Sequence, residues 1–116
     1  MPIFDAPIHT NSQGLERVIH AGAAVILVIE RRECAPCRQL DPILTRLAGA
    51  NAGALLVARI DADEAPEVLR RFQIEALPGL VFLRNAAVVG VGAGAVTEQV
   101  MQRWADHLLG KGPRPP

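Results

Sequence analysis

Two uninterrupted apolar runs with a helical pattern between them constrain the fold of this chain most strongly. The first reads AAVILVI at Ala23–Ile29, and the second reads ALLVARID at Ala54–Asp61. Neither alternates apolar with polar residues, which is typical of strands covered on both faces. Between the two runs, apolar residues recur at helical spacing at Leu40, Ile43, Leu44 and Leu47. This strand–helix–strand unit predicts parallel strands joined by a right-handed crossover.

The sequence predicts four helices: one between the two apolar runs, distorted by a proline, and three elsewhere in the chain. The central helix is expected to run from Ala35 to about Ala50 with a kink, because Pro42 has no N–H to donate. Thr10 and Gln13 have the spacing of a capping box at the start of the chain's first helix, and Ser12 is a competing cap. The outer helices are expected at His9–Gly22, Glu64–Ile74 and Thr97–Leu109.

The remaining strand signals predict an antiparallel hairpin and a short edge strand. LVFLRNAAVVGVGAG is expected to form two strands joined in a hairpin at Asn85–Ala86, and Pro7–His9 gives a weak edge-strand signal. The predicted fold class is therefore α/β, with a mixed central β-sheet and helices on both faces. The pattern predicts one domain over residues 1–110, followed by a disordered Pro-rich tail at residues 111–116.

Charge and hydropathy exclude several classes of partner. The 116 residues include 12 Lys and Arg and 12 Asp and Glu, so no nucleic-acid partner is expected. The longest apolar run is too short to cross a bilayer, and MPIFDAPIHT lacks the basic and apolar regions of a secretory leader. A chain trimmed of its leader would look the same. We expect a soluble cytoplasmic monomer with no membrane contact.

The only two cysteines, Cys34 and Cys37, have three possible interpretations: a redox pair, half of a metal site, or two thiols that are close by chance. Cys34 follows a predicted strand and opens a helix, where unpaired N–H groups should lower the pKa of its thiol below the free value of about 8.5. Pro36 suits the first helical turn, and Cys37 lies about one turn further on. One thiol could then attack a substrate disulfide and the other resolve the mixed disulfide.

A metal site would need further ligands, because structural zinc takes four. The three histidines have no ligand spacing to the cysteine pair and lie in unrelated segments, at His9, His20 and His107. No metal site is therefore expected within one chain, although a site shared across a dimer stays open.

The segment ECAPCRQLDPIL resembles the active site of the thioredoxin family, and ALPGL and GAGAV resemble two of its loops. The likeness covers about His9 to Leu109 and implies the thioredoxin fold and thiol–disulfide exchange without a cofactor. It implies that Cys34 is the nucleophile and Cys37 the resolving thiol, acting on a protein disulfide with electrons from a dithiol protein. It implies a cis peptide bond before Pro78 and a substrate groove that includes Glu33, Ala35, Pro36, Leu77, Pro78 and Gly94.

Four residues depart from the family pattern, and two of them, Gly79 and Ala62, make the expected groove less apolar. Glu33 replaces the usual tryptophan before the first cysteine and disfavours a thiolate at Cys34, whereas Arg32 and Arg38 favour one. The sequence does not decide the direction of the net shift. Val28 replaces the buried aspartate that the family places under the resolving cysteine. Glu30 is the candidate proton acceptor in its place, although a glutamate at a strand end is usually solvated. These departures keep a rival reading open, a thioredoxin-fold adaptor or chaperone-like module whose cysteines are not catalytic.

Overall fold

The sheet of the protein has five strands in the order β1-β3-β2-β4-β5, which confirms the predicted mixed α/β architecture. The structure is a computed structural model that describes residues 4–22 and 24–116. Residues 1–3 and Ala23, predicted to lie in the domain and at the start of the first strand, fall outside the described residues. The strands are β1 (Ile8–Thr10), β2 (Ala24–Glu30), β3 (Leu56–Asp61), β4 (Gly79–Arg84) and β5 (Ala87–Ala93).

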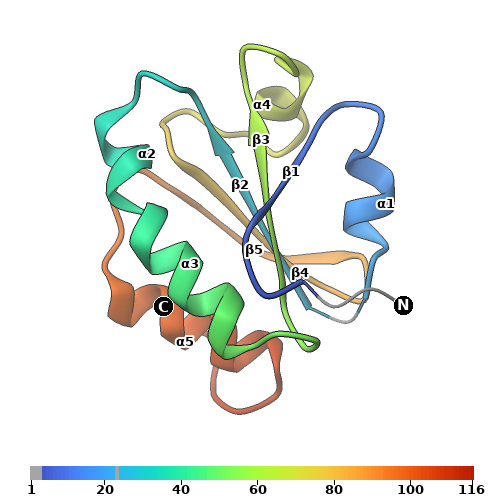
Figure 1. The fold of residues 1–116 in the computed structure, drawn as a ribbon, viewed down its shortest axis with the longest axis vertical. Helices are drawn as coiled ribbons and strands as arrows, with labels where there is room; N and C mark the ends of the chain where they lie inside the picture. Colours follow the sequence, from blue (N-terminus) through green and yellow to red (C-terminus); the bar gives the residue numbers. More distant parts are fainter. Residues whose placement is uncertain (1–3, 23) are drawn as a thin grey trace.

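Strand directions follow from the connections. β3 pairs in parallel with β2, as the crossover predicts, and also in parallel with β1, whereas β4 pairs antiparallel with β2 and β5. The helices lie on both faces of this sheet (Figure 1). They are α1 (Leu15–Ile19), α2 (Ala35–Gln39), α3 (Asp41–Ala50), α4 (Glu67–Arg71) and α5 (Glu98–Leu108).

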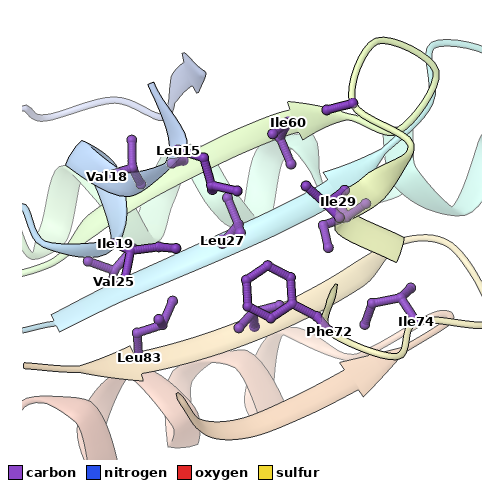
Figure 2. Packing of buried hydrophobic residues seen from close by; sticks show 14 of the residues in the cluster. Leu15, Val18, Ile19, Val25, Leu27, Ile29, Ile60, Phe72, Ile74 and Leu83 are labelled. Carbon is purple, nitrogen blue, oxygen red and sulfur yellow. The ribbon is translucent and has the colours of Figure 1, made fainter. Parts of the chain in front are cut away.

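The unbroken apolar pattern of β2 is explained by a hydrophobic core on each face of the sheet. All seven β2 residues are buried. On one face, Val25, Leu27 and Ile29 pack with side chains from α1 and the α4 segment, such as Val18 and Phe72 (Figure 2). On the other face, the alternate β2 residues pack with α3 and α5. The prediction of a strand covered on both sides is confirmed.

The capping box predicted for the first helix is wrong. Thr10 lies in β1, because its backbone pairs with Ile60 of β3 and is taken up by the sheet. Helix α1 begins only at Leu15, and its N-cap Gly14 makes no side-chain cap; it ends at Ile19 rather than near Gly22. The edge strand suggested by Pro7–His9 therefore exists, shifted by one residue.

The predicted kink at Pro42 is a complete break between two helices. Leu40 is both the C-cap of α2 and the N-cap of α3, and Pro42 falls in the first turn of α3, where its missing N–H costs nothing. The hairpin is confirmed, because Asn85 and Ala86 adopt φ values of 50° and 68° between β4 and β5. Such positive values at both central residues match the twist of the flanking strands.

The chain after α5 folds back along that helix. The guanidinium of Arg114 lies 5.9 Å from the ring centroid of Trp104, and the Lys111 N–H donates to the Asp106 carbonyl. Disorder of residues 111–116 stays a prediction. No helix within residues 4–22 and 24–116 is long and apolar enough to span a membrane.

Gly90 on β5 leaves room for the Trp104 ring, which stacks on Phe82 with centroids 4.2 Å apart. A Cβ at residue 90 would overlap Cη2 of that ring and lie 2.7 Å from Cζ3. We expect Gly90→Ala to lower the free energy of unfolding, measured by urea denaturation, by about 1–3 kcal/mol. Gly92→Ala on the same strand is the control, because its Cβ would come no closer than 3.9 Å to Leu80. Equal losses in both variants would contradict this role of Gly90.

Candidate active site

The topology brings the loop after β2, the loop after β3 and the loop before β4 to the same end of the sheet. β2 and β3 run in parallel and end together, with Glu30 opposite Asp61. β4 runs the other way and begins there, with Gly79 opposite Ile29. The segment with the two cysteines follows β2, and the loop of Pro78 precedes β4. The sequence-distant CAPC and ALPG stretches are therefore neighbours at this end.

Cys34 and Cys37 are joined by a disulfide bond, with Cα atoms 5.2 Å apart. Cys34 is the N-cap residue of α2, and its Sγ accepts a hydrogen bond from the Cys37 backbone N–H at 3.2 Å. The two sulfurs differ in access to solvent. Cys34 is half-buried, whereas Cys37 has no exposed surface. A molecule arriving from solvent can therefore reach Cys34 and cannot reach Cys37.

A groove of about 500 Å³ lies beside Cys34. One wall comes from the segment between β2 and α2, and the other from α4 and the chain that leads to β4. The groove is lined by Arg31, Glu33, Cys34, Ala35, Pro36, Leu69, Ile74, Glu75, Ala76 and Leu77.

The Leu77–Pro78 peptide bond is cis, as the resemblance implied. Leu77 lines the groove, whereas Pro78 is buried and its carbonyl accepts a hydrogen bond from the Gly94 N–H at 3.0 Å. Gly94 has a φ of +82°, which favours glycine at this position. Ile74 packs over Gly79, where an added Cβ would lie 2.7 Å from Ile74 Cγ2. The start of β4 is thereby held against the groove.

A cluster of four charged side chains joins the end of β2 to the α2–α3 break. Glu30 Oε1 is bound by Arg59, with Nη2 at 2.9 Å, and Glu30 Oε2 by Arg38 Nη2 at 2.9 Å. Asp41 completes the cluster through Arg59 Nη2 and, at 3.8 Å, Arg38 Nη1. Burial opposes the charge on Arg59, but its bonds to Asp41 and Glu30 outweigh that effect, so the pKa of this guanidinium lies above its ordinary value.

The structure brings most of the predicted site residues together and adds others. Four residues expected in the groove line it with Cys34: Glu33, Ala35, Pro36 and Leu77. Pro78, Gly94, Glu30 and Cys37 lie outside the lining. Sequence reasoning missed Arg31, Leu69, Ile74, Glu75 and Ala76. The signal available for the last three was their position just before the cis proline, in the loop already expected to face the cysteines.

No group of three or more metal-ligating side chains occurs in the described part of the chain. The structure therefore offers no assembled metal site there from His, Cys, Asp and Glu.

Comparison with known proteins gives one consistent result. The family model described as Thioredoxin matches residues 7–107. The chain belongs to the thioredoxin family. It is 24% identical over 101 residues to thioredoxin from Chlorobaculum thiosulfatiphilum, which covers 87% of this chain and 94% of that protein. It is 23% identical to the mitochondrial thioredoxin of Mus musculus, of which it spans 57%.

The fold agrees with a solved thioredoxin structure. A mutant thioredoxin from Halobacterium salinarum superposes with a TM-score of 0.83 at 22% identity, covering 100% of this chain and 99% of that one. Because its two cysteines are joined, this member of the thioredoxin family is a thiol–disulfide oxidoreductase. Thioredoxins act on protein disulfides and with reductants. The adaptor alternative is not favoured.

Proposed function

We propose that this thioredoxin-family protein exchanges its Cys34–Cys37 dithiol with disulfides of protein substrates, with Cys34 as nucleophile and Cys37 as resolving thiol. The observation that supports these roles is the difference in access. Cys34 borders an open groove, whereas Cys37 has no exposed surface and is bonded to Cys34. Only the accessible sulfur can begin the exchange with a large substrate.

The proposed reaction has two steps, each of which exchanges one S–S bond. The Cys34 thiolate attacks one substrate sulfur, the substrate S–S bond breaks, and the other substrate sulfur leaves as a thiolate. The Cys37 thiolate then attacks Cys34 Sγ and releases the second substrate thiolate. The substrate gains two electrons and two protons, and the protein ends with the Cys34–Cys37 disulfide. A dithiol protein would return the electrons in the reverse sequence.

The groove positions the substrate in this proposal. Leu77 lines the groove with Cys34, and in this proposal its backbone pairs with an extended substrate segment. Such strand addition gives affinity with little demand on sequence. Ala35, Pro36 and Glu33 form the opposite wall. Pro78 and Gly94 act from behind, because the bond between them holds the shape of the docking loop.

Glu30 stays a candidate proton acceptor for Cys37. Each of its carboxylate oxygens is bound by an arginine, so a proton taken from Cys37 would remove the charge that holds Arg38 and Arg59. A resolving step with the same rate in Glu30→Gln would rule out Glu30 as the acceptor. A monomer in a reducing compartment such as the cytoplasm, with no nucleic-acid partner, remains part of the proposal.

The test is reduction of a protein disulfide by the chain with excess dithiothreitol, compared with its Cys34→Ser variant. Wild type should accelerate the reaction, and Cys34→Ser should fall to the rate of dithiothreitol alone, because serine cannot form the S–S intermediate. Turnover that survives in Cys34→Ser would show that the chemistry lies elsewhere.

A further inference from the structure

The charges on the two groove walls do not cancel. Three ionisable side chains other than Cys34 line the groove: Arg31, Glu33 and Glu75. The Arg31 guanidinium is already paired, because its Nε lies 2.9 Å from Asp63 Oδ1. Within the described residues, neither Glu33 nor Glu75 forms an ion pair. The groove therefore presents two uncompensated carboxylates, both exposed, one on each wall.

The wall of the groove opposite Cys34 also carries apolar side chains. Leu69, Ile74 and Leu77 line the groove on the wall opposite Cys34. Ile74 belongs to the core beneath the groove, and Leu69 and Leu77 pack against that core. Arg32 and Arg70 are exposed nearby but do not line the groove. A segment lying in the groove meets three apolar side chains on one wall and one carboxylate on each wall.

From this arrangement we propose that the groove selects cysteine-containing protein segments that carry lysine or arginine beside the reactive cysteine. The proposal rests on the proposed exchange function and names its substrate class. Two unpaired carboxylates attract a cationic segment and repel an anionic one, at the point where the substrate sulfur must approach Cys34. The formal net charge of the whole chain is zero, so the selection comes from the groove and not from the overall field.

The test uses three peptides that differ only in the two residues flanking one cysteine, which are lysine, glutamine or glutamate. Each cysteine is blocked as a pyridyl mixed disulfide, whose neutral thiopyridone leaving group absorbs light when released. The rate with reduced protein is divided by the rate with dithiothreitol, which removes the intrinsic reactivity of each peptide. Since the comparison is between peptides on one protein, differences in the reactivity of the Cys34 thiolate also cancel.

We expect the corrected lysine-to-glutamate rate ratio to be about tenfold at low ionic strength, since an exposed charge pair changes a rate about two- to fivefold. The ratio should fall towards one at about 0.5 M salt, which screens exposed charges. In the double variant Glu33→Gln with Glu75→Gln the ratio should approach one. In the control variant Glu64→Gln, which removes an exposed carboxylate outside the groove, it should be unchanged.

The two proposals fail in different ways. Corrected rates that are equal for the three peptides, or a lysine preference that survives in the double variant, would overturn the charge selection and leave the exchange function standing. Absence of thiopyridone release from every peptide would overturn both.

Discussion

The Cys37→Ser variant is expected to attack substrate disulfides at the wild-type site and then to stop at the mixed disulfide. In the proposed mechanism the Cys37 thiolate resolves that intermediate from within the same chain, one helical turn from Cys34. A well-placed internal group is worth an effective concentration far above that of any external thiol. Catalytic turnover of a protein disulfide should therefore fall by about a thousandfold or more.

The trapped species can be measured directly. Non-reducing electrophoresis and intact mass should show one substrate chain bound to each Cys37→Ser molecule, and dithiothreitol should release it. Cys34→Ser is the matched control, because Cys37 has no exposed surface and should trap nothing. Equal trapping by the two serine variants would show that the sulfurs are equally accessible in solution and would remove the basis for their assigned roles.

The fold was predictable where pattern and topology point to the same structure. The apolar β2 run needs cover on both faces, and the strand–helix–strand order needs a parallel pair, so the centre of the sheet follows from the sequence. The start of the chain shows the opposite case. Thr10 and Gln13 fit a helix cap locally, but pairing of Thr10 with β3 supplies backbone hydrogen bonds that override the cap.

The site residues within the sequence motifs were predictable, whereas the residues that folding brings to the site from other segments were not. The CAPC segment and the cis proline could be located from the motif, whereas Leu69 and Glu75 enter the groove only because the α4 segment lies opposite Cys34. Glu30 was expected to be solvated, as strand-end glutamates usually are. The available signal was Arg59, a charged residue inside a buried run, which requires a partner. Only the β2–β3 register shows that this partner is Glu30.

The charge cluster behind the cysteines leads to the second large expected effect. The side chains of Glu30 and Arg59 are only 9% and 10% exposed, and Arg59 binds both Glu30 and Asp41. The Arg59→Met variant keeps much of the side-chain volume but leaves a buried carboxylate with Arg38 as its remaining partner. We expect the free energy of unfolding, measured by urea denaturation, to fall by about 3 kcal/mol, because an undercompensated buried charge is costly.

Two further variants separate charge from packing in this result. Removing both charges, in Glu30→Leu with Arg59→Met, should recover most of the lost stability, since Arg38 and Asp41 are exposed enough to be hydrated. Arg46→Met breaks an ion pair with Glu98 at the surface, where both side chains are about half exposed, and should change stability little. If the double variant is no more stable than Arg59→Met alone, the cost comes from lost packing of the arginine stem.

The cluster joins β2 and β3 to the break between α2 and α3, so its loss should also loosen the helix that carries Cys37. Amide exchange in α2 should therefore rise in Arg59→Met but not in Arg46→Met.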